Sequence, residues 1–251
     1  MKKSLYGICG LAIGLSLVSA SAMASNCNGL PNNAQLRKAL TSAKVEKNGG
    51  FSLNMWATVV NRDGFVCAVA FSGPTRNHQW PGSRIISAQK AYTANAFSLD
   101  GLALSTANLY SATQPGGSLF GLQASNPIDA QTAYQGNPNR YGLAVDPLVG
   151  KKIGGINVFG GGLGLYKIKD GKKHIVGAIG VSGDSSCADH NIAWRTRANL
   201  GSLGLNVIPA GVSKAGDDGM VYSADSTYTG WEHPDCGNGE RAVSEAIGAG
   251  H

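Results

Sequence analysis

The chain has 251 residues, of which 43% are hydrophobic and 14% are charged, and its formal net charge is +6. This length is sufficient for one sizeable hydrophobic core, or for a core with elaborations. The basic residues are scattered and form no stripe with interleaved aromatic residues, so nucleic-acid binding is not an expected function.

The first residues have the pattern of a secretory signal peptide. Lys2 and Lys3 form a basic start, Leu5 to Val18 is an apolar run, and Ala22-Met23-Ala24 is a small-x-small cleavage site. A retained membrane anchor is the alternative, but the apolar run is shorter than a bilayer span requires. We therefore expect cleavage near Ala24, a periplasmic or secreted protein, and no membrane span in residues 25–251.

Cleavage would leave four cysteines, Cys27, Cys67, Cys187 and Cys236. An even number in an oxidising compartment predicts two disulfides, for which three pairings exist. The preferred pairing is Cys187–Cys236 with Cys27–Cys67, because the first bond would attach a weakly patterned tail to the start of a helix. Buried free thiols are the alternative. The absence of a Cys-x-x-Cys motif argues against a zinc ribbon, a thioredoxin-type site and covalent haem attachment.

The first half of the chain begins with a helix and a hairpin. Residues 33–47 have the apolar spacing of a helix, which Asn48-Gly49-Gly50 ends. Two strands are predicted at residues 53–61 and 65–71, and Asp63-Gly64 between them is a strong hairpin signal.

A loop and further helices follow the hairpin. Residues 74–82 form the loop, and Ser83 begins a helix of mostly small residues that runs to about Leu99. Residues 104–113 predict a short second helix. Residues 118–150 contain three Asn-Pro or Asp-Pro pairs and predict an elaborated loop, which is usually functional or a subunit contact.

The second half completes the sheet. Strands are predicted at residues 153–159, at residues 163–168 and from His174 to about Val181, and Asp170-Gly171 marks the hairpin between the last two. A Gly183 turn then leads into a helix capped by Asp184, Ser185 or Ser186. The predicted fold is α+β, with a mostly antiparallel five-stranded sheet flanked by helices, and a Gly- and Asp-rich tail that wraps its surface.

Three segments resemble a known family. The stretch from Val176 to Gly183, with the Asp- and Ala-containing helix after it, resembles the C-terminal signature of the GlcG/HbpS-type haem-binding domains. Gln89-Lys90-Ala91-Tyr92-Thr93-Ala94 is similar to the Lys-Ala-x-Thr-Ala helix of that family, and Gly154 to Val158 resembles its Gly-Gly-x-Pro strand, with Asn157 where proline is more usual. The resemblance covers about residues 33–203.

This resemblance implies a profilin-like fold, oligomeric assembly, and haem binding in at least some members, some of which are described as haem-degrading. It divides the chain into a signal peptide at residues 1–24, a GlcG/HbpS-like domain at 25–203 with an insertion at about 121–150, and a C-terminal extension at 204–251. The insertion and the extension are departures from the short family domain.

The expected haem site lies on the loop at 74–82 and the helix after it. His78 is the preferred ligand of the haem iron, because imidazole is a common axial ligand, and Trp80 would pack on the porphyrin. Four further residues complete the expected haem site, with the arginines and the lysine placed to meet propionates: Arg76, Arg84, Lys90 and Tyr92. The alternatives are an exposed loop histidine, a structural hydrogen bond at Lys90 and core packing of Tyr92.

Other patterns give weaker signals for chemistry. Cys187-x-x-His190 with Asp184 and Asp189 could bind a metal, although a disulfide at Cys187 is the preferred interpretation. Ser182 lacks the Gly-x-Ser-x-Gly context of a nucleophile elbow. The glycine-rich run at 159–165 lacks the Gly-Lys-Ser/Thr of a phosphate-binding loop.

The sequence therefore predicts a periplasmic haem- or tetrapyrrole-binding protein that acts in storage, sensing or delivery rather than in turnover. One alternative is an enzyme or accessory protein that acts on a small organic acid or aromatic compound. Another is a structural oligomer in which the insertion near Tyr134 and Tyr141 contacts a second copy. The expected partners are haem or another small molecule, and further copies of the chain.

Overall fold

A computed structural model describes residues 27–223 and 229–251, so the leader expected at residues 1–24 lies outside the described residues. In the described part, the main sheet has four strands in the order β2-β1-β4-β3, and every neighbouring pair is antiparallel. The strands are β1 (Trp56–Asn61), β2 (Val66–Phe71), β3 (Gly162–Lys169) and β4 (Lys172–Ser182). Both predicted hairpins are present, and the one between β3 and β4 turns at Asp170 and Gly171, where φ is positive at both residues.

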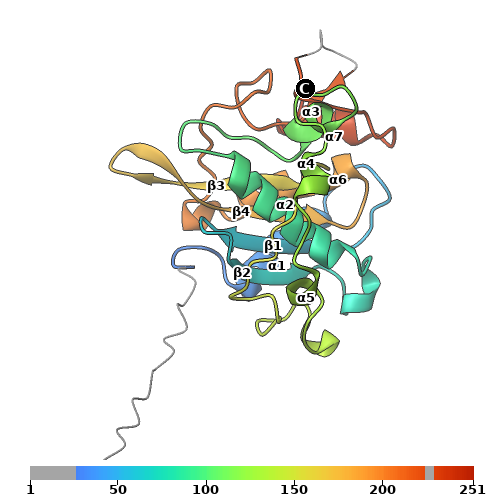
Figure 1. Cartoon of the computed structure of the whole chain (residues 1–251), viewed down its shortest axis with the longest axis vertical. Coiled ribbons are helices and arrows are strands. Elements are labelled where there is room, and N and C mark those ends of the chain that lie inside the picture. Colours follow the sequence, from blue (N-terminus) through green and yellow to red (C-terminus); the bar gives the residue numbers. More distant parts are fainter. Residues whose placement is uncertain (1–26, 224–228) are drawn as a thin grey trace, which may run out of the picture.

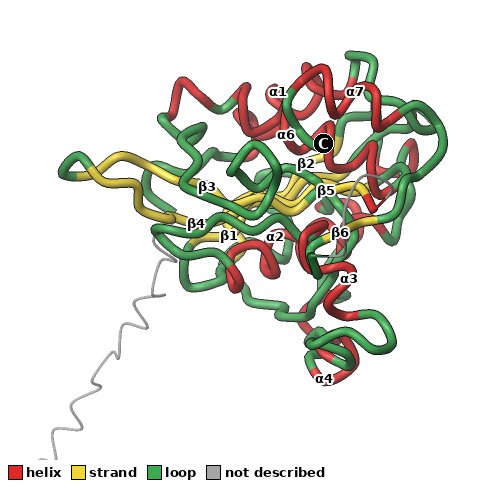
Figure 2. The backbone as a smooth tube through the Cα atoms, turned by 90° about the horizontal axis from the view of Figure 1, so that it is seen from above, coloured by secondary structure: helices red, strands yellow, loops and turns green. Residues whose placement is uncertain are grey.

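Helices cover both faces of this sheet (Figures 1 and 2). Helices α1 (Asn33–Lys44) and α6 (Ser186–Asn199) pack on one face, and α2 (Ser83–Phe97) packs on the other. Each face of the sheet has its own buried apolar cluster, because side chains alternate between the faces along a strand. The result is a mixed α/β fold of three layers.

The contact between α2 and β4 is unusually close. A side chain at Gly180 would overlap the carbonyl oxygen of Ser87 and the backbone nitrogen of Ala91. Three alanines, Ala88, Ala91 and Ala94, lie fully buried on α2. Small residues on both elements therefore bring the helix onto the sheet, as the composition of this segment predicted.

The prediction of a fifth strand at residues 153–159 is wrong. Gly154 and Gly155 have φ of 63° and 81°, which a strand residue does not adopt. Side chains satisfy the backbone instead, since Asn157 N donates to the hydroxyl of Thr93 at 3.0 Å. Ile153, Ile156 and Val158 of this segment still lie in the core, whereas Phe159 at its end is exposed.

The helices between α2 and β3 are short, with three or four residues each. The helix expected at 104–113 is a 3₁₀ turn, η2 (Ala107–Leu109), followed by α3 (Tyr110–Thr113). The insertion packs against the sheet, and at Gly142 (φ 75°) a side chain would overlap the ring of Phe71 on β2. Three other short helices lie here, α4 (Leu122–Ser125), α5 (Ala130–Ala133) and η3 (Pro138–Arg140).

The tail beyond residue 203 lies against α6. It forms a small parallel pair, β5 (Val221–Tyr222) with β6 (Glu232–His233), and then α7 (Glu240–Ile247), which packs on α6. The two disulfides among the described residues, Cys27–Cys67 and Cys187–Cys236, are the pairing preferred from the sequence. Two 3₁₀ turns complete the elements, η1 (Arg76–His78) and η4 (Gly201–Leu203).

Within residues 27–223 and 229–251, no helix combines the length and the apolar character that a bilayer span requires.

Candidate functional site

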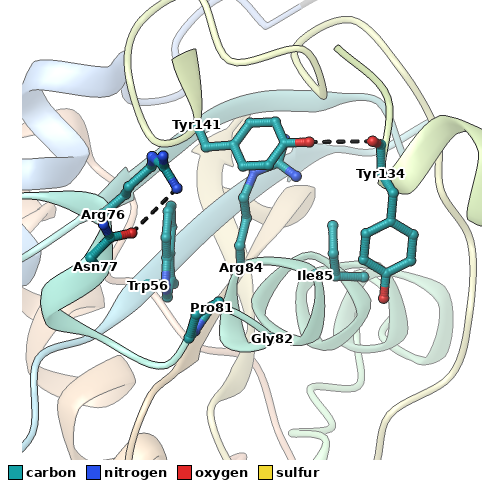
Figure 3. Close-up of a pocket in the computed structure, with 9 residues that line it drawn as sticks. All are labelled: Trp56, Arg76, Asn77, Pro81, Gly82, Arg84, Ile85, Tyr134 and Tyr141. Carbon is teal, nitrogen blue, oxygen red and sulfur yellow. Dashed lines mark hydrogen bonds between the residues drawn. The ribbon is translucent and has the colours of Figure 1, made fainter. Parts of the chain in front are cut away.

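Two cavities open beside the first turns of α2, on different sides of the helix. The first measures about 250 Å³ and contains Arg84 and Ile85 of α2. The second measures about 270 Å³ and contains Ser83, Ile86 and Lys90. The other residues of the first cavity are Trp56, Arg76, Asn77, Pro81, Gly82, Tyr134 and Tyr141 (Figure 3). The other residues of the second are Trp80, Phe159, Ser182, Asp184, Ser186 and Asp189.

Arg84, in the first cavity, is already paired within the protein. Its Nε donates to Asp146 Oδ2 at 3.0 Å, and its Nη2 donates to the other carboxylate oxygen. The guanidinium also stacks on the ring of Tyr141, 3.6 Å from the centroid. Both charged groups are buried. Arg84 therefore holds the insertion against α2, and its charge is neutralised before any ligand arrives.

Arg76 is the more available cation of this cavity. Among the described residues its guanidinium reaches only two amide oxygens, Asn77 Oδ1 at 3.2 Å and Asn139 Oδ1 at 3.5 Å. Neither partner is charged, and the side chain is half-buried at the cavity wall. An anionic group in the cavity can therefore pair with Arg76 without displacing an ion pair.

His78 lies on η1, next to Asn77 of the first cavity, but it lines neither cavity itself. Its Nδ1 is 2.9 Å from the hydroxyl of Thr75, and no hydrogen bond to its Nε2 forms within the described residues. The side chain is exposed. An imidazole held through one nitrogen and free at the other has the arrangement of a metal-binding histidine.

The structure divides the expected haem site between several places. Arg76 and Arg84 line the first cavity, whereas Trp80 and Lys90 line the second. Tyr92 lines neither and packs with the apolar cluster around Leu104. The predicted site contained only two of the residues that line the first cavity. The other lining residues come from β1, from the loop and helix at 77–85 and from the insertion: Trp56, Asn77, Pro81, Gly82, Ile85, Tyr134 and Tyr141.

Lys90 makes a buried ion pair at the floor of the second cavity. Its Nζ donates to Asp189 Oδ2 at 2.6 Å and to the carbonyl of Val181 at 3.1 Å. Asp189 also accepts the backbone N–H groups of Gly183 and Asp184. Burial lowers the pKa of Lys90 and raises the pKa of Asp189, while the mutual attraction of the pair opposes both shifts. The pair ties α2 to the start of α6.

The metal site considered at Cys187 and His190 does not form. Cys187 is disulfide-bonded, and the imidazole closest to its sulfur is that of His233, with Nδ1 at 4.0 Å. Cys187, His233 and Cys236 bring their ligand atoms within 4.8 Å of one another, but both sulfurs are in the disulfide. His190 is buried, neither of its ring nitrogens has a hydrogen-bond partner within residues 27–223 and 229–251, and burial lowers its pKa to about 3.

Comparison with known proteins identifies one matching family. A sequence model of the family described as "Haem degrading protein HbpS-like" matches residues 32–197. No curated protein sequence matches the chain.

Several solved structures are similar in fold. They include a PduOC–haem complex (22% identity, 66% of this chain and 89% of that chain, TM-score 0.44) and Klebsiella pneumoniae protein ORFY (24% identity, 67% and 87%, TM-score 0.43). HbpS is also similar (16% identity, 67% and 86%, TM-score 0.40).

Proposed function

We propose that this chain, which belongs to the HbpS-like haem-degrading protein family, binds haem or a related tetrapyrrole as a periplasmic or secreted protein. Storage, sensing or delivery is the proposed role. The observation that carries the proposal is His78, an exposed imidazole whose Nε2 has no hydrogen-bond partner among the described residues. It follows directly in sequence after Arg76 and Asn77, which line an apolar cavity.

The residues around the first cavity fit such a ligand in chemistry. Imidazole ligates haem iron in many proteins, the aromatic and aliphatic walls suit a flat macrocycle, and Arg76 suits a propionate. The cavity volume of about 250 Å³ is below the ~300–1,000 Å³ of pockets that enclose a drug-sized ligand. A tetrapyrrole would therefore place one edge in the cavity and leave the rest at the surface. Bound haem would supply an iron centre whose properties depend on its axial ligand.

Titration of the protein with hemin tests the proposal. Binding should shift the Soret band, and His78→Ala should reduce that shift because it removes the proposed iron ligand. His174→Ala is the matched control, since His174 is also accessible to solvent and lies on β4, where its ring is 2.8 Å from Asp100. Tyr134→Phe tests a phenolate ligand from the same cavity. A protein that gives no Soret shift with micromolar hemin does not have this function.

The role of Arg76 is tested separately. Arg76→Met should weaken hemin binding by roughly tenfold, as expected for the loss of one charge-assisted hydrogen bond worth about 1.5 kcal/mol. Arg140→Met is the control, because Arg140 is exposed on η3 and does not line the cavity. Equal losses in the two variants would show a general charge effect instead of a propionate contact.

A second copy of the chain is also a proposed partner. Leu143, Val145 and Val149 of the insertion are exposed, at 40%, 62% and 37%. Deleting the insertion would remove Asp146 from Arg84, so a point variant is the better test. Val145→Asp should shift an oligomer toward monomer in size-exclusion chromatography, while Ile168→Asp at an exposed site on β3 should not. A wild-type protein that elutes as a monomer contradicts this assembly.

A further inference from the structure

A serine and a histidine that the proposed haem site does not use form a close hydrogen-bonded pair. The hydroxyl of Ser186, at the start of α6, lies 2.7 Å from Nε2 of His233 on β6. The Cys187–Cys236 disulfide holds the β6 segment beside the helix. The two side chains are 47 positions apart in the sequence and are joined by the fold.

The direction of this hydrogen bond follows from the other ring nitrogen. Nδ1 of His233 is 2.7 Å from the carbonyl oxygen of Pro234, which can only accept, so Nδ1 carries the proton. Nε2 of the neutral ring is then an acceptor, and the hydroxyl of Ser186 donates to it. A serine that donates to a histidine, which is itself oriented by a carbonyl, has the arrangement of an activated nucleophile.

His233 is neutral over the physiological range. Burial lowers its pKa to about 4, and the positive charge of Lys90 acts in the same direction, while the carbonyl of Pro234 opposes it. Tyr110 contacts the ring, with centroids 5.0 Å apart, and the buried His190 is also within electrostatic range. The nitrogen that faces Ser186 is therefore free to take a proton.

Ser186 lines the second cavity, which has polar groups without partners on its floor. Ser83 and Ser182 are 3% and 4% exposed and line the same cavity, and within the described residues neither hydroxyl has a hydrogen-bond partner. These two hydroxyls are therefore available to hydrogen-bond a ligand in the cavity. Trp80 and Phe159, both about half exposed (51% and 47%), form apolar walls above them.

We infer that Ser186 and His233 are the nucleophile and the general base of an acyl-transfer site that hydrolyses small aryl esters in the second cavity. Ser186 Oγ attacks the ester carbonyl carbon while its proton passes to Nε2 of His233. The bond from this carbon to the aryl oxygen breaks, and the proton moves from Nε2 to the departing phenolate. Water then attacks the acyl carbon and loses a proton to Nε2, the bond from this carbon to Ser186 Oγ breaks, and the proton passes from Nε2 to Oγ. The carboxylic acid is released and the serine is regenerated. Lys90 and the hydroxyl of Ser182 are donors for the carbonyl oxygen.

We infer an aryl ester as the substrate from the basicity of His233 and from the aromatic walls of the second cavity. An imidazole with a lowered pKa is a weak base, so it suits a substrate whose leaving group departs easily, and phenolates leave more readily than alkoxides or amines. The exposed rings of Trp80 and Phe159 provide surfaces on which an aromatic group can pack.

Covalent labelling of the folded, disulfide-bonded protein tests the inference. A fluorophosphonate probe should add once, on Ser186, as located by peptide mass spectrometry. The protein should hydrolyse p-nitrophenyl acetate at least tenfold faster than Ser186→Ala does. Ser125→Ala, which removes an exposed hydroxyl on α4, should leave both results unchanged. His233→Asn should slow labelling at least a hundredfold.

The pH dependence separates a catalytic pair from a structural one. Hydrolysis should increase as pH rises through about 4, where His233 loses its proton, and should be constant above this. Wild-type labelling is informative even if a variant fails to fold, which circular dichroism would detect. An absence of adduct on Ser186 in folded wild type, or labelling that is as fast in a folded His233→Asn variant, overturns the inference.

Discussion

At the residue scale, three buried ion pairs join distant parts of the described chain: Arg84–Asp146, Lys90–Asp189 and Arg197–Asp218. Each connects a helix that packs on the sheet to a loop, to another helix or to the tail. Removing charges from water is costly, so such pairs contribute little compared with apolar residues of equal volume. Breaking one is different, because the remaining charge is then buried without a partner.

The Arg84–Asp146 pair gives the first prediction at this scale. Arg84→Met should lower the free energy of unfolding by about 3–5 kcal/mol, because it leaves the carboxylate of Asp146 buried and without its cation. Arg76→Met, in the wall of the same cavity, should cost less than about 1 kcal/mol, since the hydrogen-bond partners of the Arg76 guanidinium in the described part of the chain are neutral amides. Urea unfolding measures both, and similar losses in the two variants would contradict the prediction.

His190 gives a second prediction, concerning pH. Its pKa is about 3 in the folded protein, mainly through burial, and 6.5 in the unfolded chain. The unfolded state therefore binds more protons between these values, and stability decreases as pH falls below 6.5. His190→Leu removes this dependence. The loss of stability between pH 7 and pH 5 should be about 2 kcal/mol smaller in this variant.

Urea unfolding at the two pH values checks the His190 prediction. Asp189 has its pKa raised to about 6 by burial and therefore acts in the opposite direction, gaining relative stability as pH falls. It is present in both proteins, so its contribution cancels in the comparison. An equal pH dependence in wild type and His190→Leu would show that His190 is not the responsible group.

The loop and helix that form part of the first cavity were predicted from the sequence, but most of the residues that line the cavity were not. Arg76 and Arg84 were found because they flank an expected loop and helix start. Asp146, the partner of Arg84, lies 62 positions away in the sequence, and no local sequence pattern predicts such a contact. His233 was missed for the same reason. The preferred Cys187–Cys236 pairing placed His233 near Ser186, and combining the two observations would have found the pair.

At the element scale, sequence patterns predicted the elements whose hydrogen bonds join residues that are close in the sequence. The hairpins at Asp63-Gly64 and Asp170-Gly171 depend on two turn residues each, and both were predicted. The strand expected at 153–159 failed because alternating apolar residues also occur in an irregular buried segment. The positive φ of Gly154 and Gly155 distinguishes this irregular segment from a strand. A glycine adopts positive or negative φ with similar ease, so the sequence alone does not predict its φ.

The Cys187–Cys236 disulfide gives a prediction at this scale. It closes a 49-residue separation between the start of α6 and the tail. The double variant Cys187→Ala/Cys236→Ala should lose about 4 kcal/mol of stability in the chain-entropy estimate. Hydrogen exchange should increase selectively at residues 229–239, while β1 and β4 keep their protection. A uniform increase across the sheet would mean that the bond supports the whole fold rather than the tail.

At the scale of the whole molecule, the tail beyond residue 203 is a structural part of the domain. Asp218 is fully buried and pairs with Arg197 of α6 through two hydrogen bonds of 2.6 and 2.8 Å. Glu240 accepts the hydroxyl of Ser185, which caps the same helix, at 2.6 Å. The family match ends at residue 197, so the chain completes its fold with residues that the match does not include.

Truncation after residue 203 should therefore destabilise the whole domain, because the tail contributes buried contacts. Arg197, only 2% exposed in the full chain, would lose its carboxylate partner, and the apolar contacts of Met220 and Tyr222 would also be lost. We expect residues 27–203 to show no cooperative thermal transition. Asp218→Asn in the full chain isolates the ion pair and should cost about 3–5 kcal/mol. If residues 27–203 unfold cooperatively with the Tm of the full chain, the tail is an accessory segment and Arg197 must have found another partner.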